Sequence, residues 1–235
     1  MEKFIYGNFS YQYKLIKKDR KTLTLTITPE KEIIIKAPKD ISDEKLEKFL
    51  KRKWSWMNKQ LDFFTKVKRE KYKRKFVSGE SFYYLGRQYK LVVSKGNEDT
   101  VQLLKGVLKL TTSNSVKDIK NIEKILKNWF KIKAEAIFKE RYQVMGMKFD
   151  YKNLPVLGLR KMSRRWGTFI NKDKICLNPK LIHASKDCID YVITHELCHV
   201  RYKNHNKMFW KFMEEKYPNW VKVKDKLEER YSFLV

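Results

Sequence analysis

Three of the four histidines in this 235-residue chain lie within residues 195–205. His195, Glu196 and His199 form the pattern His-Glu-x-x-His. Side chains four residues apart lie on one face of a helix, so the two imidazoles of this pattern can bind one metal ion. Glu196 lies beside that face, where its carboxylate can take a proton from a water molecule activated by the metal. The segment therefore predicts a hydrolytic metal site on a helix.

The position of the helix end decides the third metal ligand. On a continuing helix, His205 would be rotated by about 240° from His199, so both can bind one ion only if the helix ends between them. Asn204 tolerates the left-handed backbone conformation that ends many helices. His205 is the favoured third ligand. Glu214 and Glu215 are the alternatives, since some zinc sites combine two histidines with a glutamate from a later helix.

The residues around the motif argue against a solvated helix and against a structural metal site. Apolar side chains recur at helical spacing before and after the motif, at Ile189, Val192, Ile193 and Val200. Glu196 lies close to this apolar stripe, where a carboxylate without a polar partner is costly. Structural zinc sites usually have four protein ligands, most often cysteines, but the three cysteines form no Cys-x-x-Cys pair. Three histidines leave one metal position open for water.

A small sheet is expected directly before the metal helix, from residues 156–162, 166–170 and 175–177, with a turn at 171–174. If residues 166–170 form its edge strand, an extended peptide substrate can pair with it. Arg164 and Arg165 would lie near the mouth of the cleft, either holding a substrate carboxylate or phosphate or serving as surface charge. Tyr191, Tyr202 or Arg165 could donate a hydrogen bond to the oxyanion.

The other predicted elements precede this region. Residues 23–28 and 33–37 are typical of a β-hairpin with a loop at 29–32, and Ser42 begins a helix with one apolar side. Further strands are expected at 82–93, with a turn at Gly86, and at 101–104 and 107–110. A long helix is expected to begin near Ser115 and to end at Gly146. The aromatic side chains of both helices are interpreted as core residues.

Several segments form a pattern that extends over nearly the whole chain. They are residues 165–167, 175–178, 189–199, 204–205 and 209–210, together with 21–29 and 37–38. This pattern resembles the YgjP-like zinc metallopeptidase family, a zincin-type group similar to SprT. The resemblance implies zinc bound by His195, His199 and His205, with Glu196 as the general base. Thr168-Phe169 stands where that family usually has Ser-Cys, so no role is assigned to a thiol there.

The expected fold class is α+β. An N-terminal antiparallel β-rich domain with one long helix is predicted for residues 1–112. A zincin-like metallopeptidase domain, with a small antiparallel sheet beside the metal helix, is predicted for residues 113–235.

Three functions remain open. The first is a zinc-dependent metallopeptidase acting on peptides or unfolded protein. The second is a metal-dependent nucleoside triphosphate pyrophosphohydrolase, in which the arginines hold phosphates, although the chain has no glycine-rich phosphate loop. The third is a nucleic-acid-associated SprT-like protease.

Composition adds expectations about partners and location. The chain has 54 Lys and Arg residues against 27 Asp and Glu, a formal net charge of +27, and its densest basic block lies at residues 66–75. Such a charge predicts loose electrostatic binding of nucleic acid. No apolar run of about 18 residues is present, so no membrane span is expected. Three scattered cysteines and an N-terminus unlike a signal peptide favour the cytoplasm.

Overall fold

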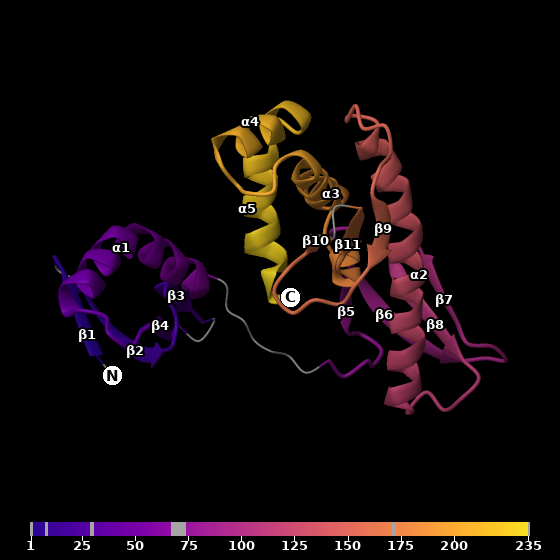
Figure 1. Ribbon diagram of the computed structural model, residues 1–235. Helices are drawn as coiled ribbons and strands as arrows, with labels where there is room; N and C mark the ends of the chain where they lie inside the picture. Colours follow the sequence, from indigo (N-terminus) through magenta and orange to yellow (C-terminus); the bar gives the residue numbers. More distant parts are fainter. Residues whose placement is uncertain (1, 8, 29–30, 67–73, 171–172, 235) are drawn as a thin grey trace. The chain divides into compact units, whose positions relative to one another are not determined.

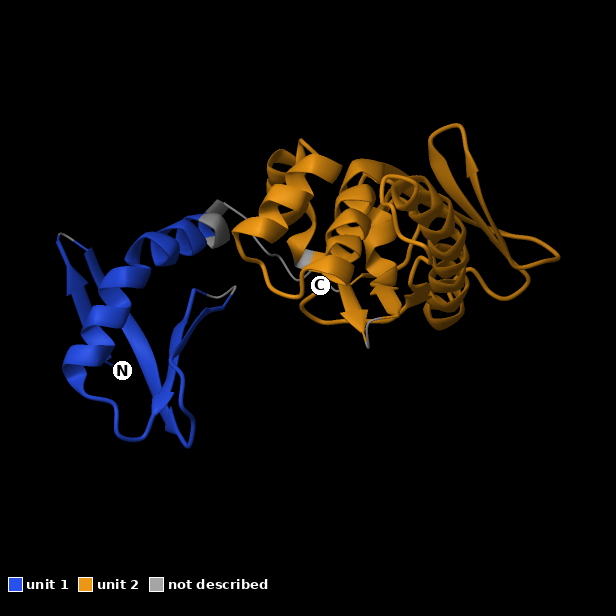
Figure 2. Cartoon of the chain, turned by 45° about the horizontal axis from the view of Figure 1, so that its top comes forward, with its two compact units in different colours: residues 1–72 blue, residues 73–235 orange. Residues whose placement is uncertain are grey.

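The computed structural model describes residues 2–7, 9–28, 31–66, 74–170 and 173–234. The chain forms two units, Met1–Tyr72 and Lys73–Val235 (Figures 1 and 2). The predicted domain boundary after residue 112 differs from this division. The reason is that the strands before residue 112 share one hydrophobic core with the helices that follow them. Most of the basic block at residues 66–75, and parts of the loops at 29–32 and 171–174, lie outside the described residues.

Unit 1 is a four-stranded sheet with one helix against it (Figure 1). Its elements are β1 (Glu2–Tyr6), β2 (Phe9–Lys18), β3 (Thr24–Ile27), β4 (Ile33–Pro38) and α1 (Asp43–Lys66). The strand order is β1-β2-β4-β3. Buried Ile33, Ile35 and Ala37 alternate with less buried residues along β4, as expected for a strand with one covered face. Leu50 and Met57 of α1 are buried in the same core.

Unit 2 begins with the same order of elements as unit 1. These are β5 (Ser81–Tyr84), β6 (Arg87–Lys95), β7 (Thr100–Leu104), β8 (Val107–Thr112) and α2 (Ile119–Gly146). The strand order is β5-β6-β8-β7, which corresponds strand for strand to that of unit 1. Asp118, rather than Ser115, caps α2, because its side chain accepts a hydrogen bond from the Asn121 N–H at 3.1 Å. The helix ends at Gly146, as predicted.

The strand registers of the two units also agree. In the first hairpin of unit 1, Phe4 pairs with Tyr11 and Tyr6 pairs with Phe9. In the first hairpin of unit 2, Phe82 pairs with Tyr89 and Tyr84 pairs with Arg87. The parallel pairing of the second and fourth strands also corresponds. Tyr13, two residues after Tyr11, pairs with Ile33 in unit 1, and Leu91, two residues after Tyr89, pairs with Leu108 in unit 2. The chain therefore contains two copies of one ββββα arrangement.

The rest of unit 2 contains a three-stranded sheet and a group of helices. The strands are β9 (Val156–Leu159), β10 (Gly167–Ile170) and β11 (Lys174–Leu177). The helices are η1 (Pro179–His183), α3 (Lys186–Arg201), α4 (Lys207–Lys216), α5 (Trp220–Tyr231) and η2 (Ser232–Leu234). The strand order is β10-β11-β9, so β10 is an edge strand. Helix α3 packs against α2, α4, α5 and β10.

The α+β class is confirmed, but the three sheets are mixed rather than antiparallel. The hairpins pair as expected, whereas β2–β4, β6–β8 and β9–β11 are parallel. The reason is that the hairpins β3–β4, β7–β8 and β10–β11 each join an earlier strand through their later strand, which runs in the same direction as that neighbour. No helix in the described part of the chain is long and apolar enough to cross a membrane.

Candidate metal centre

Helix α3 is buried on nearly all sides, which fixes the direction of its polar side chains. Residues 188–194 and 196–198 are buried. Asp190 receives two hydrogen bonds of 2.7 Å from Arg141 on α2, through Nε and Nη2. A bidentate pair of this kind fixes both position and rotation. Helix α3 is therefore held against α2 with its His195 and His199 side toward α4 and the loop before it.

The three histidines of the motif meet at one point. Helix α3 ends at Arg201, and Tyr202 is extended, with φ −124° and ψ 106°. The chain then turns back, and Nε2 of His205 lies 2.9 Å from Nε2 of His195. One nitrogen from each of His195, His199 and His205 lies within 4.8 Å of the others. The helix ends between residues 199 and 205, as the third ligand requires, but Tyr202 ends it in an extended conformation without a left-handed Asn204.

Aromatic side chains of α4 hold the histidines from behind. The ring of Phe209 lies 5.1, 4.8 and 4.6 Å from the rings of His195, His199 and His205. Trp210 stacks on His205 at 5.4 Å. Asn206 caps α4, since its side chain accepts a hydrogen bond from the Phe209 N–H at 3.0 Å. The residue that follows His205 therefore begins the helix that supports it.

The donor set fits a metal that prefers neutral imidazole. Nδ1 of His199 lies 3.0 Å from the carbonyl oxygen of Tyr202 and donates to it, which leaves Nε2 free to bind an ion. Burial lowers the pKa of His195 to about 3, and burial also lowers the pKa of His205. Both rings are thus neutral at pH 7, the form that binds zinc. The alternative ligands Glu214 and Glu215 are exposed on α4.

Glu196 lies against the backbone of β10. Its side chain is only 6% exposed, and a Cβ atom added to Gly167 would lie 2.7 Å from its Oε1. The absence of a side chain at Gly167 therefore gives the carboxylate its place. Burial raises the pKa of Glu196 to about 8, while the charge of Arg165 and a hydrogen bond from the Phe169 N–H act in the opposite direction. This carboxyl group can hold or release a proton near neutral pH.

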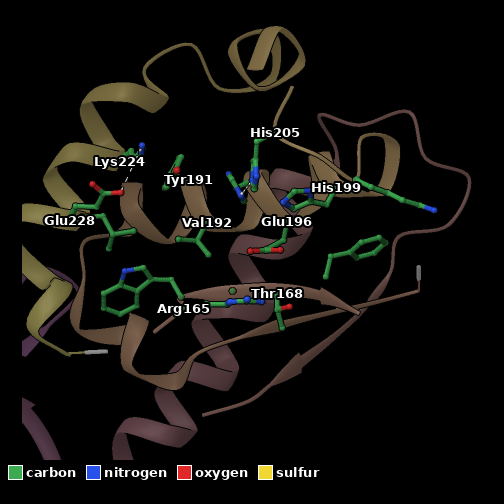
Figure 3. Close-up of a pocket in the computed structure, with 15 residues that line it drawn as sticks. Arg165, Thr168, Tyr191, Val192, Glu196, His199, His205, Lys224 and Glu228 are labelled. Carbon is green, nitrogen blue, oxygen red and sulfur yellow. Dashed lines mark hydrogen bonds and ion pairs between the residues drawn. The ribbon is translucent and has the colours of Figure 1, made fainter. Parts of the chain in front are cut away.

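A cavity of about 740 Å³ opens in front of these groups (Figure 3). Figure 3 shows Glu196 pointing from α3 toward Arg165 and Thr168. The lining comes from the segment leading into β10, from α3 and its following loop, and from α5: Arg165, Trp166, Gly167, Thr168, Phe169, Tyr191, Val192, His195, Glu196, His199, Lys203, His205, Lys224, Leu227 and Glu228. The cavity thus contains all four residues predicted to carry the chemistry.

The four predicted contact residues divide into two pairs. Arg165 and Tyr191 line the cavity, and the ring of Tyr191 lies 5.9 Å from that of His195. Arg164 is exposed and is not part of the lining. The ring of Tyr202 packs against Phe212 at 5.6 Å, outside the lining, and Tyr202 contributes only its carbonyl group to the site.

The wall of the cavity formed by α5 was not predicted from the sequence. Lys224 and Glu228 line the cavity, with Nζ of Lys224 3.9 Å from Oε1 of Glu228. Burial raises the pKa of the Glu228 carboxyl group. Leu227 between them is buried. The apolar spacing of Val223 and Leu227 marks the buried side of α5, but only tertiary packing brings the flanking charges to the cavity.

The chain is similar to known metallopeptidases. Residues 21–230 match the family model described as YgjP-like, metallopeptidase domain. No curated protein sequence matches the chain. Among solved structures, the metallopeptidase zymogen abylysin of Pyrococcus abyssi is similar, with 17% identity and a TM-score of 0.35. That match covers 42% of this chain and 94% of the abylysin chain. Because the family model covers most of the chain, this protein belongs to the YgjP-like metallopeptidase family.

Proposed function

We propose that this protein is a zinc-dependent metallopeptidase, with His195, His199 and His205 as zinc ligands and Glu196 as the general base. The observation that carries the proposal is the convergence of three imidazoles beside a buried carboxylate, inside a cavity of about 740 Å³. Cavities of about 300–1,000 Å³ are typical of ligand sites. Three protein ligands leave a position for water, which is the arrangement of catalytic rather than structural zinc.

The residues of the chain supply the proton transfers. Zinc, when bound, supplies a Lewis acid that polarises a carbonyl group and lowers the pKa of water toward about 7. Glu196 takes a proton from the attacking water as the new C–O bond forms, and gives it to the leaving amine as the C–N bond breaks. The Phe169 N–H holds the Glu196 carboxylate in place. Tyr191 and Arg165 are placed in the cavity to stabilise the oxyanion.

The edge of β10 supports an extended peptide as substrate. β10 has a neighbour on one side only, and its residues Gly167, Thr168 and Phe169 line the cavity. A peptide can add to such an edge through backbone hydrogen bonds. Because the added strand must be extended, the favoured substrates are peptides and unfolded proteins.

A second candidate is hydrolysis of nucleoside triphosphates. Three cationic side chains, Arg165, Lys203 and Lys224, line the same cavity. Arginine and lysine bind phosphate oxygens, and a metal ion activates water for attack on phosphorus as well as on carbon. The same residues would then act on a different electrophile.

One experiment separates the two candidates. Zinc-loaded wild type, Glu196→Gln and the control Glu215→Gln each receive a mixture of denatured peptides and nucleoside triphosphates, with products measured by mass spectrometry. New peptide termini from wild type and Glu215→Gln, and none from Glu196→Gln, support the peptidase. Intact peptides with Glu196-dependent loss of triphosphate overturn it in favour of the nucleotide hydrolase.

A further inference from the structure

The two ββββα units differ in what covers their first hairpin. In unit 2, the 3-10 helix η1 lies over the turn between β5 and β6. The backbone N–H groups of Leu85 and Gly86 donate hydrogen bonds to the carbonyl oxygens of Ile182 (3.0 Å) and His183 (3.2 Å). Leu181 and Ile182 are fully buried. The segment η1 therefore covers the end of the first hairpin through both backbone hydrogen bonds and apolar side chains.

Aromatic rings of β5 and α2 lie next to η1 in unit 2. Tyr84, at the end of β5, lies 5.1 Å from Trp129 and 6.4 Å from Phe130 on α2. His183 of η1 packs edge-on against Phe130 at 4.5 Å. The hairpin end and the helix thus offer one aromatic surface, and η1 covers it.

Unit 1 has a comparable aromatic surface, which no segment among its described residues covers. Tyr6 and Phe9, which pair across the hairpin end, lie 5.1 and 5.7 Å from Trp54 on α1. Tyr6 corresponds to Tyr84 in strand register, and Phe9 corresponds to Arg87. Tyr6 is 39% exposed and Phe9 is 51% exposed. Among residues 2–7, 9–28 and 31–66, no segment takes the place that η1 has in unit 2.

The exposed rings are held in position from below. Nε1 of Trp54 donates a hydrogen bond to the hydroxyl oxygen of Tyr11 at 3.2 Å, and the Tyr11 hydroxyl donates to Asn58. Ordered apolar side chains grouped at the surface are typical of an interaction site, because their exposure to water is unfavourable. Tyr6, Phe9 and Trp54 are called the aromatic patch of unit 1 below.

We propose that the aromatic patch of unit 1 binds a short apolar segment of another polypeptide, in the manner in which unit 2 binds η1. The chemistry of the partner follows from η1, which presents leucine and isoleucine side chains and backbone carbonyl groups. Unfolded proteins expose such segments, whereas folded proteins bury them. If the proposed peptidase function holds, the patch is an exosite that retains unfolded substrates.

Apolar contact, rather than charge, is what η1 makes in unit 2, and this favours a polypeptide over a nucleic acid. Lys51 on α1 interacts electrostatically with Tyr6. Its Nζ lies 2.7 Å from Oε1 of Glu47, so its charge is already paired. Binding of nucleic acid relies on cations that contact phosphates beside the aromatic rings. Apolar contact remains as the main contribution of this patch.

The test uses the full-length Glu196→Gln chain, which cannot hydrolyse its ligand under the proposed mechanism. The probe is a fluorescent peptide with the sequence of residues 178–184, and its binding is measured by anisotropy. Phe9→Ser and Tyr6→Ser are each expected to weaken binding about tenfold, the loss typical of removing one aromatic anchor. The control Ile132→Ser removes a side chain that is 54% exposed on α2, and it should leave binding unchanged.

Equal affinity of all three variants and the parent would overturn the proposal, since the peptide would then bind elsewhere, including the catalytic cavity. Two further results would also overturn it. One is Phe9-dependent binding of a single-stranded oligothymidylate with no binding of the peptide. The other is Phe9-dependent self-association in sedimentation without peptide binding. Circular dichroism of Phe9→Ser and Tyr6→Ser establishes that both variants are folded.

A kinetic measurement separates failure of the exosite from failure of the peptidase function. With active enzyme and reduced, carboxymethylated lactalbumin as unfolded substrate, Phe9→Ser should raise KM about tenfold and leave kcat unchanged. Hydrolysis of a peptide too short to reach both sites should not change. Cleavage with identical KM in wild type and Phe9→Ser would overturn the proposed exosite and leave the proposed peptidase function standing. Peptide binding without any cleavage would overturn the proposed peptidase function and leave the proposed binding site standing.

Discussion

Units 1 and 2 share a ββββα arrangement, yet among the described residues only unit 2 carries a candidate metal site. The difference lies in how far the buried side chains extend along the helix of each unit. Buried residues continue along α2 from Ile122 to Met145. Among the described side chains of α1, Met57 is the last buried residue of the core. The ββββα arrangement is therefore a scaffold, and the chemistry comes from elements packed onto the far part of α2.

Two contacts attach the catalytic elements to this scaffold. Arg141 on α2 binds Asp190 on α3, which orients the metal helix. Segment η1, directly before α3, covers the first hairpin of unit 2. Unit 1 has neither attachment within its described residues, and its hairpin end is exposed. The comparison predicts large effects at the metal site, intermediate effects at the attachments, and small effects at the corresponding positions of unit 1.

The largest effect is expected from removing a metal ligand. His205→Ala should reduce bound zinc and lower peptidase activity about a thousandfold, or about 4 kcal/mol in the activation free energy. Zinc content is measured by mass spectrometry of the metal after gel filtration. Glu215→Ala is the matched control and should keep zinc and activity. Full zinc content in His205→Ala would place the third ligand elsewhere and would direct attention to the glutamates of α4.

The next effect compares the covered hairpin with the exposed one. Ile182→Ala removes a fully buried side chain and should destabilise unit 2 by about 3 kcal/mol. Phe9→Ala removes a half-exposed side chain from the corresponding surface and should cost unit 1 less than about 1 kcal/mol. Hydrogen exchange measured by mass spectrometry reports on each unit separately. Equal destabilisation by both changes would mean that the aromatic patch of unit 1 is already covered.

Local sequence spacing accounts for what could be predicted of the site. His195, Glu196 and His199 belong to one helix, and His205 follows it closely, so their meeting depends on only one helix end. Lys224 and Glu228 reach the cavity from a helix about thirty residues away, and nothing in their local pattern distinguishes them from surface charges. The meeting of the three histidines could therefore be predicted because its geometry is local, whereas the contribution of α5 to the cavity depends on packing.

The fold shows the same limit. Individual hairpins and helices follow from alternation and capping, and most were predicted at the right residues. The parallel central pairs were missed because no turn records them; they form when two separate hairpins join. The repeat was also missed, because few identities, such as Phe4 with Phe82 and Tyr6 with Tyr84, survive between the copies. Shared topology is visible only in three dimensions.

An intermediate effect on the reaction rate is expected at Gly167, which lies against the carboxylate of Glu196 in unit 2. In Gly167→Ala, the new Cβ would lie 2.7 Å from Oε1 of Glu196, so the carboxylate must move. Displacing a catalytic group by about 1 Å costs about a hundredfold in rate, so kcat should fall by that factor while zinc content stays the same. Gly158→Ala in the same sheet is the control, since its Cβ would meet the flexible end of Lys174 at 3.0 Å and Sγ of Cys176 at 3.5 Å, an ordinary contact distance. Unchanged kcat in Gly167→Ala would show that the reaction does not require the Glu196 carboxylate in this position.

The smallest effect concerns pH, and it should affect one unit only. All four histidines of the chain belong to unit 2. Burial lowers the pKa of His183 from 6.5 to about 4, while its Nδ1 donates to the Tyr83 carbonyl at 2.6 Å. The unfolded chain therefore takes up a proton at a higher pH than the folded chain does. The stability contributed by the neutral ring is complete above pH 6.5 and is lost as the pH falls toward 4.

Between pH 7 and pH 5, this loss amounts to about 2 kcal/mol for unit 2. His183→Asn keeps a side-chain N–H for Tyr83 but has no titrating group, so its unit 2 should lose about 2 kcal/mol less than wild type over the same range. The difference between the two proteins removes the contribution of the metal-site histidines, which both retain. Unit 1, which has no histidine, should show the same free energy of opening at both pH values once the pH dependence of intrinsic amide exchange is subtracted. Identical pH dependence of unit 2 in wild type and His183→Asn would mean that the His183 ring is solvated and that η1 does not seal the hairpin of unit 2.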